Sequence, residues 1–444
     1  MRIQLSDHFT FKRLLRFVAP SIIMMTFTSI YSIVDGLFIA NYAGKTAVAA
    51  INLIFPLIII LGAIGFMFGS GGSALVAKTL GEGDKERANQ YFSLIVYFTA
   101  AAGILIAMAG VFAVPWCVKL LAHTDSGELF DYCVLYGRIL LAGQPFFILQ
   151  NSFQSFFVTA EKPRLGLLVT VGAGVMNIAL DAILVAGFRL GLEGAAWATF
   201  SSQVFGGLVP VFYFAHKNNG LLRFTRTKFY FKALMKAATN GSSEFLSNVS
   251  ASVVMMLYNE QLLRLAGDDG VAAYAAIAYV SMIFFSIFMG FAVGSVPVFG
   301  YNYGAQNKVE LKNLFKKAVT IIFVSGLIMT ILAESLAVPI VSLFGFSEEL
   351  NSMTLHGHRL FSICYLMGGA GTFGSALFTA LNNGLISAII SFVRTIVLKI
   401  LCILILPMLL GLDGVWISST VSELIALFVA AAFILAFRKR YGYL

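Results

Sequence analysis

The chain is 444 residues long, and 59% of its residues are hydrophobic while only 11% are charged. Soluble domains are usually about one quarter charged, so this composition excludes an ordinary soluble protein. The net charge is +9, but the basic residues fall in alternate loops, so membrane orientation explains them better than nucleic-acid binding does. No nucleic-acid partner is therefore expected.

Apolar stretches of about 20 residues, long enough to cross a bilayer, recur along the whole chain. They predict an all-α integral membrane protein, because β-barrel strands would alternate in polarity and be about half as long. The first stretch continues to Ala40, which is too long for a cleaved signal peptide. Twelve transmembrane helices are predicted, over residues 14–41, 50–78, 91–117, 130–158, 164–187, 192–216, 232–264, 270–302, 313–344, 351–380, 385–408 and 412–437.

Lysine and arginine predict the orientation of these helices, because cytoplasmic loops collect them. The side that carries the N-terminus holds 22 of these residues in its loops and at the adjoining ends of spans, whereas the other side holds 6. Both termini are therefore expected in the cytoplasm, in a multi-pass protein of a bacterial cytoplasmic membrane.

The two halves of the chain repeat each other. "LGLEGAAWATFSSQ" (190–203) matches "LGLDGVWISSTVSE" (410–423) at an offset of 220 residues. This offset covers six helices, so both halves begin on the same side of the membrane in a parallel 6+6 repeat. We expect an N-lobe over 1–216, a cytoplasmic linker over 217–231 and a C-lobe over 232–444, with a central cleft between the two pseudo-symmetric lobes.

Ionisable residues inside spans are costly, so each one is a candidate functional residue. Asp35 lies in the first span, within "SIYSIVDGLFIA", and Asp181 lies in the fifth, one turn after Asn177. Asp181 and Thr199 are each nine residues from the turn near residue 190, which predicts equal depth in an antiparallel pair. Two carboxylates, an amide and a hydroxyl at one level suit a hard monovalent cation or a shared proton. A structural alternative is that a buried acid pairs with Arg138, the basic candidate within these six helices.

The internal repeat supplies a comparison for these acids. At an offset of 220 residues, Asp35 corresponds to Met255 and Asp181 to Leu401. The second half is expected to keep the fold without these acids, which favours a functional role for them.

In the second half, Glu244 is the deep acid of a polar helix that also contains Asn240. We expect this face to line a wet cleft; hydrogen bonding between helices is the alternative. Arg394 and Lys399 could pair with Glu423 or with Glu244 in a structural role.

Further candidates for the wall of the substrate cleft are Tyr31, Phe153 and Met255, since aromatic and methionine side chains accommodate bulky cations. Pro20, which removes a helix hydrogen bond, and Gly36 are the candidate hinge residues.

Several segments together resemble one family. Pro20, "DGLFIANYAGKTAVAAINLIFP" (35–56), "LGEGDKERA" (80–88), "MNIALDAILV" (176–185) and "GLEGAAWAT" (191–199) are similar to multidrug and toxic compound extrusion (MATE) transporters. The resemblance covers nearly the whole chain and looks closest to the bacterial DinF-like and MepA-type branches.

This resemblance implies two six-helix lobes, a V-shaped cleft, and export of organic cations against inward movement of H⁺ or Na⁺. It also implies a coupling-ion pocket at Asp35, Asn177, Asp181 and Thr199, near Tyr31, with Pro20 as a bending position. Branches with an acid at the position of Glu244 carry another deep acid three spans later, which this chain lacks.

The sequence thus predicts a monomeric antiporter for amphipathic organic cations that works by alternating access. It is not expected to be an enzyme, and it needs no cofactor and no metal beyond a possible Na⁺ at the four pocket residues. A flippase for a lipid-linked saccharide is the alternative; it would need a strongly cationic cleft, for which only Arg394 and Lys399 are available.

Overall fold

The computed structural model describes residues 3–122, 125–216 and 220–444, and these residues form helices and connecting segments without a β-strand. The first half contains α1 (Phe11–Tyr42), α2 (Lys45–Gly81), α3 (Lys85–Ala122), α4 (Glu128–Ala142), α5 (Gln144–Thr159), α6 (Pro163–Asp181), the π-helix η1 (Ala182–Gly187) and α7 (Gly191–Ala215). The second half contains α8 (Phe231–Gly304), α9 (Lys308–Ser335), α10 (Ala337–Ser342), α11 (Glu348–Ser362), α12 (Tyr365–Ala380), α13 (Gly384–Phe392), the π-helix η2 (Val393–Leu398), α14 (Lys399–Leu410) and α15 (Leu412–Tyr441).

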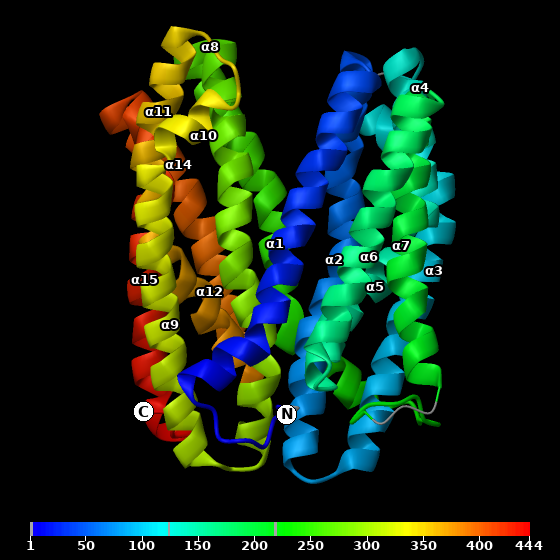
Figure 1. The fold of residues 1–444 in the computed structure, drawn as a ribbon, viewed down its shortest axis with the longest axis vertical. Helices are drawn as coiled ribbons and strands as arrows, with labels where there is room; N and C mark the ends of the chain where they lie inside the picture. Colours follow the sequence, from blue (N-terminus) through cyan, green and yellow to red (C-terminus); the bar gives the residue numbers. More distant parts are fainter. Residues whose placement is uncertain (1–2, 123–124, 217–219) are drawn as a thin grey trace.

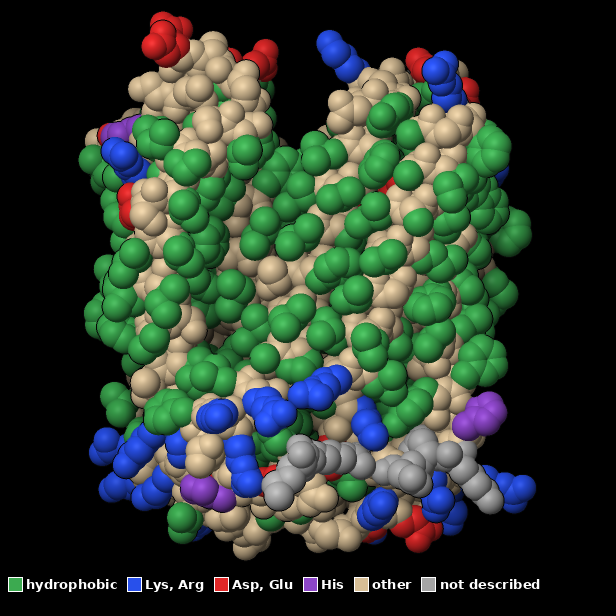
Figure 2. Space-filling view, viewed as in Figure 1, with side chains coloured by type: hydrophobic (Ala, Val, Ile, Leu, Met, Phe, Trp, Pro, Cys, Tyr) green, Lys and Arg blue, Asp and Glu red, His purple; other side chains and the backbone are tan. Residues whose placement is uncertain are grey.

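The helices form two bundles that stand side by side, α1–α7 in one and α8–α15 in the other (Figure 1). The bundles meet at the end that carries both termini and part at the opposite end. The space-filling view shows the resulting cleft between the two bundles (Figure 2). On the face shown, lysine and arginine side chains form a belt across the closed end, below a broad apolar surface (Figure 2). The expected architecture of two lobes around a cleft is confirmed.

The predicted number of twelve spans is not reproduced by helix length and composition alone. Among the described residues, nine helices are long and apolar enough to cross a membrane, or up to eleven if each of two bent helix pairs is one span. The bends are 53° between α4 and α5 and 46° between α11 and α12. The first bend lies at Gly143, whose added Cβ would be only 2.7 Å from Gln203 Oε1.

Helix α8 counts once in that number although it has 74 residues. At 1.5 Å per residue its length would be about 110 Å, more than twice the thickness of a bilayer with its headgroups. Gly267 breaks it, with φ 61° and ψ −152°, a conformation that favours glycine. The two arms then lie side by side, since the rings of Tyr258 and Tyr274 stack with centroids 4.6 Å apart. The expected break between the predicted spans 232–264 and 270–302 is therefore reduced to one non-helical residue.

The N-terminal segment links the two halves at the closed end. The Leu5 N–H donates to Glu161 Oε1 of the first half at 2.7 Å. Four residues later, the Phe9 N–H donates to Glu310 Oε1 of the second half at 2.9 Å. Both Leu5 and Phe9 are fully buried in the hydrophobic core of the second half. Part of the predicted linker 217–231 lies outside the described residues; the remainder leads into α8 at Phe231.

A seam of glycines closes the end opposite the cleft mouth. A Cβ added to Gly71 of α2 would lie 2.0 Å from the Ala237 carbonyl oxygen, and one added to Gly241 would lie 1.8 Å from the Met67 carbonyl oxygen. A second crossing repeats this contact with the other arm of α8, where a Cβ on Gly304 would lie 2.0 Å from the Lys78 carbonyl oxygen. Small residues at helix crossings allow backbones to touch in this way. Helix α2 is thereby packed tightly against both arms of α8.

We expect Gly71→Ala to destabilise this closed end, because the new methyl group would overlap the α8 backbone. Overpacking of this kind typically costs about 1–3 kcal/mol. The thermal unfolding temperature of the purified variant in detergent should therefore fall. Gly36→Ala is the matched control, because a Cβ at Gly36 meets no atom within 4 Å. Equal unfolding temperatures for the two variants would contradict the assigned role of the seam.

Candidate functional site

A glycine on α6 brings the two acids of the first half together. A Cβ added to Gly174 would lie 2.5 Å from Phe27 Cε1 and 2.9 Å from Tyr31 Cδ1, so these α1 rings pack directly against the α6 backbone. Asp35 is one turn after Tyr31 on α1, and Asp181 is two turns after Gly174 on α6. The two carboxyl groups consequently lie close enough to interact directly.

The pocket around these acids has more hydrogen-bond acceptors than donors. Asp181 is fully buried and Asn177 is 1% exposed. The Asn177 Nδ2 donates to Thr199 Oγ1 at 3.5 Å. Asp35 Oδ1, Asn177 Oδ1 and both carboxyl oxygens of Asp181 have no hydrogen-bond partner of acceptable geometry among the described residues. Unsatisfied buried oxygens in such number fit a site that takes a proton or a hard cation.

Tyr136 of α4 belongs to this pocket, and the sequence analysis did not identify it. Its side chain is 2% exposed and interacts electrostatically with both Asp35 and Asp181. It also belongs to the hydrophobic cluster that covers the pocket on the cleft-mouth side, together with Ile39 and Val185. Counting from the ends of α1 and α4 places Tyr136 and Asp35 at similar depth, but it does not give the rotation of α4 that turns Tyr136 toward the acids.

The structure does not show the alternative arrangement, in which a buried acid pairs with Arg138. Arg138 is exposed and forms no ion pair with either carboxylate in the described part of the chain. The two acids therefore lie together without a basic partner.

The helix carrying Asp181 changes its winding directly after that residue. The π-helix η1 begins at Ala182 and ends at Gly187, where the chain turns into α7. The turn itself uses positive φ angles at Arg189 and Gly191. Single π-helical turns within α-helices are frequent at functional sites. Here the wider turn separates Asp181 from the tight α6–α7 connection.

The second half contains a buried ion cluster with predominantly positive charge. Arg394 Nε lies 2.8 Å from Glu423 Oε2, and Lys399 Nζ lies 3.3 Å from Glu423 Oε1. The Glu423 side chain is 1% exposed, whereas those of Arg394 and Lys399 are 14% and 17% exposed. Arg394 also donates to the Gly368 carbonyl, and Gly371 leaves room for its side chain. The expected pairing of Arg394 and Lys399 with Glu423 is confirmed.

This ion cluster occupies the place that the acid pocket has in the first half. Ser419, which corresponds to Thr199, accepts from Lys399 Nζ at 3.5 Å and hydrogen-bonds the Tyr258 hydroxyl at 2.7 Å. Glu423 corresponds to Gln203 at the same offset. The two halves thus place opposite charges at related positions, acids in one and two cations with a single acid in the other.

Two predicted cleft residues do not line the cleft in this structure. Phe153 is 1% exposed and stacks on Phe214 inside the core of the first bundle, with ring centroids 5.6 Å apart. Asn240 is fully buried, and its Nδ2 donates to Asn382 Oδ1 at 2.7 Å next to the glycine seam. Asn240 therefore follows the alternative given for this polar helix, which was hydrogen bonding between helices.

The other three cleft candidates remain accessible. Met255 is 52% exposed, Glu244 is partly exposed, and Arg394 acts on Glu244 electrostatically. Tyr31 is partly buried between α1 and α6, as described above. Their contact with a substrate stays a prediction.

The hinge candidates lie in a continuous helix. Pro20 is buried in α1, which extends unbroken from Phe11 to Tyr42. Gly36 is exposed, and the space beside it is open, so it does not mediate a close helix crossing here. Bending at either residue stays a prediction.

Comparison with known proteins identifies the same two repeats. The MatE family profile matches residues 20–183 and again 244–405, which together make up more than half of the chain. The chain is 27% identical to the multidrug export protein MepA of Staphylococcus haemolyticus over 434 residues, covering 97% of this chain and 94% of that protein. It is 25% identical to MepA of Staphylococcus saprophyticus with the same coverage.

Solved structures share the fold. The chain superposes on an outward-facing multidrug resistance MATE transporter of the MOP superfamily with a TM-score of 0.90 and 24% identity, covering 97% of this chain and 98% of that one. A MOP superfamily transporter from Pyrococcus furiosus, described as having reversed polarity in its binding pocket, gives a TM-score of 0.87 at 24% identity, with 97% of both chains covered.

Proposed function

Because this chain belongs to the MatE family, we propose that it is a secondary antiporter that exports amphipathic organic cations in exchange for H⁺ or Na⁺. The observation that carries the proposal is the group of oxygen-bearing side chains at Asp35, Asn177, Asp181 and Thr199, which has buried unpaired acceptors and, among the described residues, no basic partner. Its relatives named MepA are multidrug export proteins, which supports the choice of substrate class.

The proposed orientation follows from the belt of basic side chains. Lysine and arginine collect on the cytoplasmic side, so the closed end with both termini would face the cytoplasm of a bacterial cell. The cleft of this conformation would then open to the outside. In this state, an ion from outside would enter the acid pocket past Asp35, which is partly exposed, and a carried substrate would leave.

Coupling requires the ion to bind the two conformations with different affinity, since a ligand shifts an equilibrium only by that difference. In our proposal, a proton or Na⁺ shared by Asp35 and Asp181 removes one unit of negative charge from the two adjacent carboxyl groups on α1 and α6. This changes how α1 packs beside Gly174 and weakens the cleft's attraction for a cationic substrate. The ion is released where the cleft opens to the cytoplasm.

The lipid-linked saccharide flippase receives less support. A pyrophosphate would need free cations in the cleft, and both Arg394 and Lys399 are engaged with Glu423. Arg138, the basic candidate within the first six predicted helices, is exposed. A monomeric assembly is part of the proposal, and no resident cofactor is proposed.

The test is transport of ethidium by the purified chain reconstituted in vesicles, with pH and Na⁺ gradients imposed separately. We expect efflux to follow one inwardly directed ion gradient and to stop when that gradient is collapsed. The gradient that drives efflux identifies the coupling ion. Efflux that proceeds equally without either gradient would refute the antiport mechanism.

A further inference from the structure

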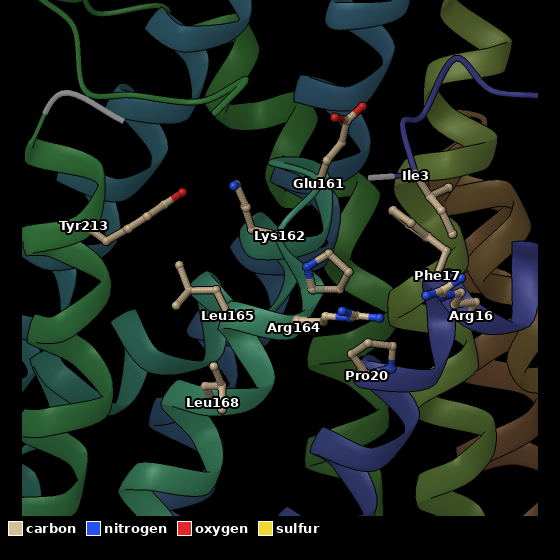
Figure 3. Close-up of a pocket in the computed structure, with 11 residues that line it drawn as sticks. Ile3, Arg16, Phe17, Pro20, Glu161, Lys162, Arg164, Leu165, Leu168 and Tyr213 are labelled. Carbon is tan, nitrogen blue, oxygen red and sulfur yellow. The ribbon is translucent and has the colours of Figure 1, made fainter. Parts of the chain in front are cut away.

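A second pocket lies at the closed end, away from the acid site and from the cleft mouth. It has a volume of about 490 Å³ and lies between the start of α1, the start of α6 and the end of α7 (Figure 3). Three basic residues line it: Arg16 of α1, and Lys162 and Arg164 at the start of α6. None of the three forms an ion pair within the described residues.

The arrangement of these cations leaves a place for an anion. The guanidinium groups of Arg16 and Arg164 extend toward each other across the pocket (Figure 3). The one acid that lines the pocket, Glu161, turns its carboxylate away from this gap and accepts the Leu5 N–H at 2.7 Å. Like charges that face each other repel, so an anion between them would be stabilised by both.

The start of α6 adds to the positive potential. Helix α6 begins at Pro163 with no side-chain cap and no acidic residue in its first turn. The partial positive charge of its N-terminus is therefore not compensated by this helix's own side chains. Phosphate groups are typical ligands for such helix ends.

The remaining wall of the pocket is apolar and continues onto the membrane-facing surface. Leu165 and Leu168 of α6 line it, and Leu168, one turn beyond Arg164, is 67% exposed. The cleft opens at the other end of the molecule, so this exposed leucine near the closed end is in a position to face lipid. The cations suit the phosphate headgroup of a phospholipid, and the exposed apolar strip beside them suits an acyl chain.

We propose that this pocket binds the phosphate headgroup of an anionic phospholipid, with Arg16, Lys162 and Arg164 as its ligands and an acyl chain along Leu168. Basic pockets between helices at the cytoplasmic interface are suited to such headgroups. A lipid in this place would tie α1 to α6 directly beside Pro20, which also lines the pocket. The lipid would therefore stabilise the conformation described here. This inference goes beyond the proposed antiport and does not depend on which ion drives it.

The test measures lipid binding to the full-length chain. Delipidated protein in detergent is titrated with dioleoylphosphatidylglycerol, dioleoylphosphatidylcholine or inorganic phosphate, and bound lipid is counted by native mass spectrometry while thermal unfolding is followed in parallel. We expect preferential binding of phosphatidylglycerol and a higher unfolding temperature with it. The variant Arg16→Gln/Lys162→Gln/Arg164→Gln should bind this lipid roughly tenfold to a hundredfold more weakly, since each cation near an anionic lipid contributes about fivefold.

The matched control removes three exposed cations from the same end of the molecule, as Arg438→Gln/Lys439→Gln/Arg440→Gln. It should bind phosphatidylglycerol like the unmodified chain. An equal loss in both triple variants would refute a specific pocket, as would an absence of preference for phosphatidylglycerol. Equal stabilisation by inorganic phosphate would refute the lipid as occupant. Should the pocket triple variant fail to fold, Arg164→Gln alone, at an exposed position, is expected to weaken binding severalfold.

Discussion

Ion-driven efflux is expected to fall to the level of empty vesicles when Asp35 is replaced by asparagine. Asparagine has nearly the same shape, so α1 should still pack against Gly174 of α6. The pocket would, however, lose one of its two interacting carboxyl groups. A neutral amide can neither take up a proton nor supply a charged ligand to Na⁺, so the ion would bind both conformations alike and no coupling would remain. The measurement is ethidium efflux under the driving gradient found for the unmodified chain.

Glu260→Gln is the matched control for this experiment. It also removes one carboxylate from an apolar span, but Glu260 is exposed on α8 and lies outside the pocket. Its efflux should equal that of the unmodified chain, and both variants should unfold at the temperature of the unmodified chain. Retained efflux in a folded Asp35→Asn protein would refute the proposed role of Asp35.

The second large effect concerns stability, and it is expected when Glu423 is replaced by glutamine. This change leaves Arg394 and Lys399 without the carboxylate that both now contact. Removing one partner of a buried ion pair typically costs about 3–5 kcal/mol, because the remaining charge is not solvated. We expect a marked fall in the thermal unfolding temperature and in the yield of folded protein.

A compensating substitution separates charge balance from loss of shape. Glu423→Gln/Lys399→Gln restores the net charge of the cluster while changing a second side chain. If unpaired charge is the cause, the double variant should be more stable than Glu423→Gln alone. A double variant that is less stable than the single one would show that packing, not charge, accounts for the effect.

Part of the candidate site and the two-lobe repeat could be predicted from residue spacing alone. Counting from the turn near residue 190 predicts that Asp181 and Thr199 lie at one depth. Asn177, one turn before Asp181, donates to Thr199 at 3.5 Å. This worked because a helix rises by a fixed amount per residue, so a short connection fixes the relative depth of its two neighbours. The offset of 220 residues likewise identified two related halves, which the family profile matches separately.

Other features depend on how helices rotate about their axes, which spacing does not determine. Phe153 was expected in the cleft, yet its helix turns it toward Phe214 in the core. Tyr136 is separated from Asp35 by about 100 residues and by three helix boundaries, so no local pattern connects them. The π-helices η1 and η2 also change the direction of every side chain that follows them, and nothing in the surrounding composition predicts such a turn.

The glycine seam has a mechanical consequence for the proposed cycle. From the seam contact at Gly304 to the break at Gly267, the second arm of α8 is about 55 Å long if it rises 1.5 Å per residue. An arm of this length works as a lever whose pivot is the α2–α8 crossing. A rotation of about 10° at the pivot would then move the tip by about 10 Å. The cleft mouth could therefore close through a small change in backbone contacts at the closed end. The close packing at Gly71, Gly241 and Gly304 would then control the largest movement in the molecule.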